Sequence, residues 1–119
     1  MAQHNELGKK GERLALDHLS GQGYTILEQN FRFDRAEIDI IAKKDTILAV
    51  IEVKTRSTSD FGNPQDFVKD KQIKNLVKAI DHYIELHDLD VEVRFDIIAI
   101  VIQSSGVEIE HLEDAFFHF

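Results

Sequence analysis

Two strand-like runs carry charged side chains in their middles, where an ordinary core strand would carry none. The first run is Ala36–Ala42, with the sequence AEIDIIA, and the second is Ile47–Thr55, with the sequence ILAVIEVKT. Successive side chains of a strand point to opposite faces. Glu37 and Asp39 are therefore expected on one face of the first run, and Glu52 lies within the second. Any fold of this chain must accommodate these acids inside its sheet.

The same alternation predicts how the neighbouring side chains are distributed. In the first run, the face opposite the acids is expected to carry Ile38, Ile40 and Ala42. In the second run, Lys54 is expected on the same face as Glu52, because the two residues are two positions apart. Each run thus combines an aliphatic face with a face that holds charge.

Four residues, Lys43–Thr46, separate the two runs, which is short enough for a β-hairpin. A two-residue turn would set Glu37 opposite Glu52, with Asp39 on the diagonal. A four-residue turn would set Asp39 directly opposite Glu52. Directly opposed Cβ atoms are about 5 Å apart and diagonal ones about 7 Å apart. Both registers gather the acids on one face of the hairpin.

Carboxylates at this spacing repel one another, so one of them should be neutral unless a cation lies between them. A hard divalent metal with oxygen ligands is the simplest solution, and Lys54 adds a fixed positive charge beside it. The alternative is a solvated hairpin face with a surface Glu–Lys pair. Continuous aliphatic and β-branched neighbours argue against that alternative and favour a functional site.

The composition is that of a globular chain, with 43% apolar and 30% charged residues in 119. This length predicts a single domain, residues 1–119, with a sizeable core. The absence of Cys excludes disulfides, thiolate metal sites and cysteine nucleophiles. No apolar stretch approaches the roughly 20 residues of a membrane span, and the N-terminal residues are too polar for a signal peptide. We therefore expect a cytoplasmic protein without a membrane partner.

The charge is distributed unevenly along the chain. The net charge is −8, but residues 1–78 contain 13 Lys and Arg against 12 Asp and Glu. Residues 79–119 contain ten acids and one base, Arg94. A polyanion could therefore be bound by the first two thirds, with modest affinity and a steep dependence on salt. The alternative is that the acidic end only keeps the protein soluble.

Periodicity and turn residues predict the order α-β-β-β-α-β-β, an α/β sandwich with a mixed sheet flanked by helices. Besides the two charged runs, the expected elements are a helix over 5–20, a strand over 24–32, a helix from Gln65 or Asp70 to His87, and strands over 91–102 and 107–112. Arg94 and Asp96 are expected to form a structural ion pair. Phe116 is expected to close the core, whereas Phe117 and Phe119 are left open between core and dimer contact.

Several motifs resemble the YraN-like family of small bacterial proteins. They are Gly8-Lys9-Lys10-Gly11-Glu12, Glu37-Ile38-Asp39-Ile40-Ile41-Ala42, Glu52-Val53-Lys54-Thr55-Arg56 and Arg94-Phe95-Asp96. The resemblance covers nearly the whole chain. The element order, with an acid on the second strand and Glu-x-Lys on the third, is similar to the restriction-endonuclease-like core of the PD-(D/E)XK nucleases. Ala36 departs from the family pattern, which usually has Gly there, and this removes no chemical group.

The superfamily resemblance implies a metal-dependent phosphodiesterase site. Asp39 and Glu52 would each give a carboxylate oxygen to Mg²⁺ or Mn²⁺, and the backbone carbonyl of Val53 would complete the protein's share. Lys54 would orient or help to deprotonate the attacking water and offset charge on the phosphorus. Glu12 would point from the first helix toward the same metal, directly or through water, with a solvent-facing helix residue as the alternative.

The resemblance also suggests residues that contact the substrate. Arg56 and Lys71 would contact phosphates beside the scissile bond, and Lys74 lies on the same basic helix, although lysines on a helix are more often simply solvated. Glu37 is either a further carboxylate of the site or a residue at the start of its strand. Gly62 and Asn63 are expected to shape a loop beside the site.

Two functions of different classes remain open at this point. One is a metal-dependent endonuclease acting on DNA, including branched repair or recombination intermediates, where symmetric cleavage of two strands would need a homodimer. The other is a non-catalytic module that binds nucleic acid or protein on a nuclease scaffold. Asp39, Glu52 and Lys54 favour the first function, because a scaffold does not need that set. The weak basicity and the acidic last third favour the second.

Overall fold

The computed structural model describes residues 6–57 and 68–116, and it shows an α/β fold in which two helices flank a five-stranded mixed sheet. The elements are α1 (Glu6–Gly21), β1 (Thr25–Phe33), β2 (Ala36–Lys44), β3 (Ile47–Arg56), α2 (Asp70–His87), β4 (Glu92–Gln103) and β5 (Gly106–Leu112). This order confirms the one predicted from periodicity. For the second helix the structure selects Asp70, not Gln65, of the two predicted starts. The other bounds differ from the predicted ones by at most two residues, because the ends of elements are set by caps and turns rather than by periodicity.

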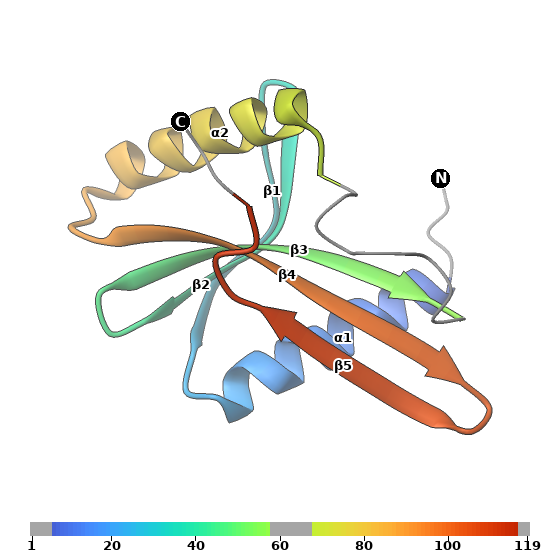
Figure 1. Cartoon of the computed structure of the whole chain (residues 1–119). Helices are drawn as coiled ribbons and strands as arrows, with labels where there is room; N and C mark the ends of the chain where they lie inside the picture. Colours follow the sequence, from blue (N-terminus) through green and yellow to red (C-terminus); the bar gives the residue numbers. More distant parts are fainter. Residues whose placement is uncertain (1–5, 58–67, 117–119) are drawn as a thin grey trace.

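The strands lie side by side in the order in which the chain makes them, β1-β2-β3-β4-β5. All neighbours are antiparallel except β3 and β4, which are parallel. A parallel pair requires a crossover connection, and α2 belongs to that connection. Figure 1 shows that α1 and α2 lie on opposite faces of the sheet.

Each helix covers its own hydrophobic cluster. On α1, Gly11, Ala15 and Leu19 are buried at intervals of four residues, and they face a cluster that contains Ile51 and Ile98. On α2, the residues at helical spacing Leu76, Ala79, Ile80 and Tyr83 are buried against the other face of the sheet. No helix in the two described stretches is long and apolar enough to span a membrane.

The predicted hairpin forms with a two-residue turn, Asp45-Thr46, rather than at Lys44-Asp45. Lys44 pairs with Ile47 and Ile40 pairs with Ile51. Asp45 adopts a left-handed conformation at φ 55°, which Asp tolerates better than most residues. The observed register equals the one expected from a four-residue turn, and it sets Asp39 across from Glu52.

One prediction about the faces of β2 is wrong. Ile38 was expected beside Ile40, but Ile38 packs in the α2-side cluster and Ile40 in the α1-side cluster. The alternation breaks at Asp39, because the residue across from it on β1, Asn30, has a left-handed backbone at φ 53°. An irregularity of this kind bends the strand and redirects its side chains. Asp39 lies at the bend.

The end of the described chain closes the α2-side core. Phe116 is buried and contacts Phe95, with ring centroids 5.4 Å apart. The amide of Ala115 also donates a hydrogen bond to the carbonyl oxygen of Phe95. The prediction that Phe116 closes the core is confirmed, whereas Phe117, Phe119, Gly62 and Asn63 lie outside the described residues.

Candidate active site: a buried carboxylate pair

Asp39 and Glu52 lie where the regular β2–β3 ladder ends. The last pair of that ladder is Ile40 with Ile51, and the two acids are the next residues on their strands. Beyond this point the Asp39 carboxylate takes the place of a backbone acceptor. Its Oδ2 accepts a hydrogen bond from the Val53 amide at 2.9 Å. The strands therefore separate at the acids, and a side chain satisfies the freed N–H group.

Glu52 is buried but only partly satisfied. Its residue is 5% exposed. Oε1 accepts a hydrogen bond of 3.3 Å from the side-chain amide of Gln72 on α2, while Oε2 has no hydrogen-bond partner within residues 6–57 and 68–116. A buried polar atom without a partner is unusual in a folded protein and requires a physical reason. Gln72 was not among the residues singled out from the sequence.

Burial raises the pKa of both acids. The pKa of Asp39 is raised to about 6, and that of Glu52 to about 8, where the charge of Asp39 adds to the effect of burial. Lys54 acts in the opposite direction on both groups and stabilises their charged forms. Both carboxyl groups therefore favour the neutral form more than ordinary acids do, as expected when acids are buried near one another.

Two further acids add to the negative electrostatic potential around Asp39. Glu12 on α1 and Glu37 on β2 both raise the pKa of Asp39. The pKa of Glu12 is itself raised, first by burial and then by the charge of Glu37. Glu37 also forms an ion pair with Arg32 at 3.6 Å. The structure thus brings Glu12, Glu37, Asp39, Glu52 and Lys54 into one electrostatic unit.

Gly11 allows α1 to lie close enough for Glu12 to belong to that unit. A Cβ atom placed on Gly11 would lie 1.9 Å from Oγ1 of Thr55 and 2.8 Å from its Cβ. These distances are far below van der Waals contact. Only glycine permits this contact between α1 and β3, and the next residue on the helix is Glu12.

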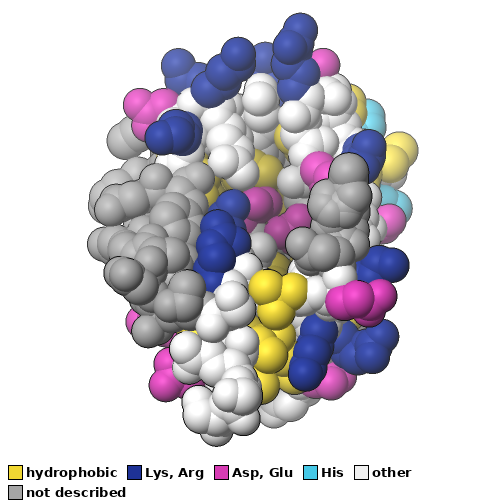
Figure 2. Space-filling view, turned by 90° about the vertical axis from the view of Figure 1, so that its right-hand side faces the viewer, with side chains coloured by type: hydrophobic (Ala, Val, Ile, Leu, Met, Phe, Trp, Pro, Cys, Tyr) yellow, Lys and Arg dark blue, Asp and Glu magenta, His cyan; other side chains and the backbone are white. Residues whose placement is uncertain are grey.

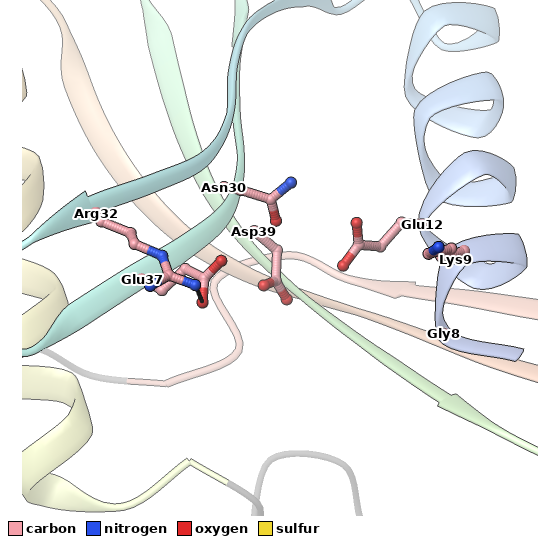
Figure 3. Close-up of a pocket in the computed structure, with 7 residues that line it drawn as sticks. All are labelled: Gly8, Lys9, Glu12, Asn30, Arg32, Glu37 and Asp39. Carbon is pink, nitrogen blue, oxygen red and sulfur yellow. Dashed lines mark ion pairs between the residues drawn. The ribbon is translucent and has the colours of Figure 1, made fainter. Parts of the chain in front are cut away.

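A cavity of about 570 Å³ lies between α1 and the β1–β2 pair, with Asp39 in its wall (Figure 3). Its lining comprises Gly8, Lys9, Glu12, Asn30, Arg32, Glu37 and Asp39. In Figure 3 the Glu12 side chain reaches from α1 toward Asp39. The sequence assigns Asn30 no role in the site, because that role depends on its place across from Asp39.

The three predicted phosphate contacts lie on β3 and α2, and all three are exposed. Lys71 and Lys74 are exposed on α2, and Arg56 is exposed at the end of β3, where it donates a hydrogen bond to the carbonyl of Thr55. Figure 2 shows acidic side chains at the bottom of a hollow, with Lys and Arg side chains beside it and gathered above it, where α2 lies. A negative centre with a positive rim is the resulting pattern.

A second buried carboxylate, Asp96 on β4, has different surroundings. It accepts two hydrogen bonds from Arg94, at 2.9 and 2.8 Å, and one from the amide of Asp114 at 3.0 Å. Nε2 of His111 lies 2.8 Å from Asp96 Oδ2, and Arg94 also donates to the hydroxyl of Tyr24. The predicted Arg94–Asp96 ion pair is confirmed, and it forms part of a larger network.

The fold and this site define an α/β protein whose β2–β3 ladder ends at two carboxyl groups, Asp39 and Glu52, with raised pKa values. The chain belongs to the uncharacterised protein family UPF0102, whose family model matches residues 11–100, and this confirms the resemblance to the YraN-like family. It is 63% identical over 119 residues to a UPF0102 protein of Christiangramia forsetii and 57% identical over 119 residues to one of Flavobacterium psychrophilum, in both cases over the full length of both chains. A UPF0102 protein of Phocaeicola vulgatus is 44% identical over 117 residues, which cover 98% of this chain and 97% of the relative.

Proposed function

We propose that this protein is a metal-dependent endonuclease that hydrolyses phosphodiester bonds of DNA on a restriction-endonuclease-like core. The observation that carries the proposal is the pair of partly buried Asp39 and buried Glu52, in which one Glu52 oxygen has no partner among the described residues and Lys54 acts on both acids. Arrangements of perturbed carboxylates next to a lysine are typical of catalytic sites rather than of structural ones. A scaffold without activity would gain stability by losing them.

The residues fit a divalent cation. Glu52 Oε2 is a buried oxygen without a partner in the part of the chain that the structure describes, and the raised pKa values mean that a cation would relieve repulsion between the two acids. In the described residues, no three His, Asp or Glu side chains form a ready metal-binding group. Mg²⁺ commonly uses only one or two carboxylates and keeps several waters. Asp39, Glu52 and the carbonyl of Val53 would therefore suffice to hold Mg²⁺ or Mn²⁺.

A bound cation would supply charge stabilisation for the phosphorane and a lower pKa for a water molecule. The chain's own residues have separate tasks. Lys54 is half-buried and lies close enough to both acids to stabilise their charges. We assign to it the positioning of the attacking water and the compensation of charge on phosphorus. Glu12 would hold a water or cation from the opposite wall.

The substrate would bind across the positive rim. Arg56 is exposed on β3, and Lys71 and Lys74 are exposed on α2, so all three can reach a sugar-phosphate backbone. The net charge of −8 predicts weak binding that is steeply dependent on salt. Cutting branched DNA on two strands would additionally require a pair of protomers.

Calorimetric titration of Mg²⁺ and Mn²⁺ at low salt tests the site directly. We expect wild type to bind, and Asp39→Asn and Glu52→Gln to bind at least about tenfold more weakly, because each loses one of two carboxylate ligands. Glu110→Gln, on the exposed strand β5, removes one negative charge elsewhere and serves as the matched control. Equal binding by all four proteins would contradict the proposal.

Cleavage of labelled DNA then separates metal binding from chemistry. Lys54→Met keeps the length of the side chain and removes its charge. We expect this variant to bind Mn²⁺ like wild type and to cleave at least about 100-fold more slowly. A Lys54→Met protein with full activity would remove the lysine from the mechanism. The absence of any metal-dependent cleavage in wild type would favour the non-catalytic binding module instead.

A further inference from the structure

The cavity beside Asp39 has a composition that the cleavage chemistry alone does not require. Three of its lining residues, Glu12, Glu37 and Asp39, belong to the acidic unit. Glu52, which faces Gln72 on α2, does not line it. The cavity therefore extends from one side of the carboxylate pair into a separate space between α1 and β1 (Figure 3).

The remaining lining offers groups for a ligand with two kinds of chemistry. Lys9 on α1 is exposed, and the side chain of Arg32 on β1 is 79% exposed, so both present a cation at the surface of the cavity. Asn30 presents a side-chain amide, which can donate and accept hydrogen bonds. A simple anion would be repelled by the acidic wall. A nucleotide combines a phosphate for the cations with a base edge for the amide.

We propose that this cavity receives one unpaired nucleotide next to the phosphodiester bond that Asp39 and Glu52 act on. The proposal rests on the nuclease function proposed above and names the substrate class of that site: DNA with at least one unpaired base at the cut position.

The size of the cavity supports a single nucleotide. Its volume of about 570 Å³ lies within the range of small-ligand pockets, about 300–1,000 Å³. Removing a base from a duplex costs a few kcal/mol, and least where it is already unpaired. Unpaired positions should therefore be cut in preference to continuous duplex.

The backbone at Asn30 fixes where its amide points. Its left-handed conformation, at φ 53°, breaks the alternation of β1 at the position across from Asp39. Figure 3 shows the amide directed into the space between Asp39 and Glu12. Asparagine amides recognise base edges through paired donor and acceptor contacts. The feature that bends the strand thus also provides a recognition group.

Four DNA substrates of one sequence test the proposal with Mn²⁺ present: a single strand, a continuous duplex, a duplex with one unpaired nucleotide, and the same duplex with an abasic site at that position. We expect cleavage next to the unpaired nucleotide, at least about tenfold faster than in continuous duplex. The abasic substrate should be cut more slowly than the unpaired one, because it lacks the base edge that Asn30 contacts.

Variants of lining residues, each matched with a neighbour outside the lining, test whether the cavity contacts the unpaired nucleotide. Asn30→Gly removes the amide and accepts the positive φ, so the backbone is retained. It should reduce the preference for the unpaired nucleotide about tenfold, whereas Gln29→Ala, the exposed neighbour outside the lining, should not. Lys9→Gln should lower the salt slope of binding by about 0.7, as for one phosphate contact, and Lys10→Gln should leave it unchanged.

Binding in Ca²⁺, followed by fluorescence anisotropy, distinguishes failure of the inference from failure of the nuclease function. Equal cleavage of all substrates, or a preference that Asn30→Gly leaves intact, would overturn the cavity assignment and leave the nuclease function standing. No cleavage at all, together with tighter binding of the unpaired substrate that depends on Asn30 and Lys9, would remove the nuclease function and retain the cavity as a binding site. Neither cleavage nor selective binding would overturn both.

Discussion

Asp96 and Glu52 lie at neighbouring positions of the β3–β4 ladder, where Asp96 pairs with Ile51 and Glu52 with Ile97. Both are buried acids in the centre of one sheet. Arg94, His111 and the amide of Asp114 surround the Asp96 carboxylate, and each offers a hydrogen bond or an ion pair. Among the described residues, the Glu52 side chain accepts one hydrogen bond, of 3.3 Å, and its second oxygen has no partner.

Because of these different surroundings, the pKa of Asp96 is lowered and the pKa of Glu52 is raised. Burial alone would raise the pKa of Asp96, but hydrogen bonds from His111 and Arg94 outweigh it and hold that pKa below its ordinary value. Burial raises the pKa of Glu52 to about 8, and the charge of Asp39 adds to the effect. Asp96 thus stabilises the fold as a charged group. At Asp39 and Glu52, by contrast, burial works against the charged forms.

The largest expected effect comes from removing the charge of Asp96. We expect Asp96→Asn to lower the free energy of unfolding by about 3–5 kcal/mol, because it leaves Arg94 without its buried partner. The measurement is urea denaturation at pH 7. A loss below about 1 kcal/mol would show that the network is not structural.

The stability difference between wild type and Asp96→Asn should also depend on pH. The folded-state pKa of Asp96 is below the unfolded value of about 3.9, so its contribution is complete above that pH. It is lost as the pH falls through the folded-state pKa. The stability difference between wild type and Asp96→Asn should therefore be constant from pH 5 to 7 and shrink below pH 4. A difference that persists in acid would contradict this linkage.

Gly11→Ala should act on the carboxylate pair and leave the Asp96 network intact. The added Cβ would overlap the Thr55 side chain, so we expect a loss of about 1–3 kcal/mol and a displacement of α1 that carries Glu12 away. Thr55→Gly removes every overlapping atom. The double variant should therefore recover part of the stability in a double-mutant cycle. Purely additive losses would show that the helix does not depend on this contact.

Glu52→Gln should stabilise the metal-free protein. Because the pKa of Glu52 is raised in the fold, stability falls as the pH rises from about 4.3, the unfolded value, to about 8. Gln cannot ionise and avoids this loss. We expect a gain of about 1–3 kcal/mol at pH 8 in EDTA, vanishing near pH 4. Lower stability of Glu52→Gln at pH 8 would contradict the comparison.

Glu113→Gln gives the smallest expected effect and the control for Asp96→Asn. Glu113 contacts the same Arg94, at 3.8 Å, but its side chain is 60% exposed. Exposed ion pairs contribute little, so the change in unfolding free energy should stay below about 0.5 kcal/mol. A larger loss would indicate that Arg94, rather than the burial of Asp96, dominates the network.

Local pattern was sufficient to predict most of the fold. Alternating and helical periodicities depend on neighbours within a few residues, and they located the described helices and strands to within two residues, except for the start of α2, which stayed open between Gln65 and Asp70. The acids of the site were visible because Asp39 and Glu52 interrupt aliphatic strands. The ion pair of Arg94 with Asp96 was visible because residues two apart share a face.

Contacts between distant residues were not accessible to the same reasoning. The sequence by itself determined the elements, the uneven charge and the presence of carboxylates within strands. Tertiary structure alone decided the break in alternation at Asp39, the contact of Gln72 with Glu52 and the close approach of Gly11 to Thr55. The reason is physical: these features depend on strand register, helix packing and burial, which arise only when segments far apart in the chain meet.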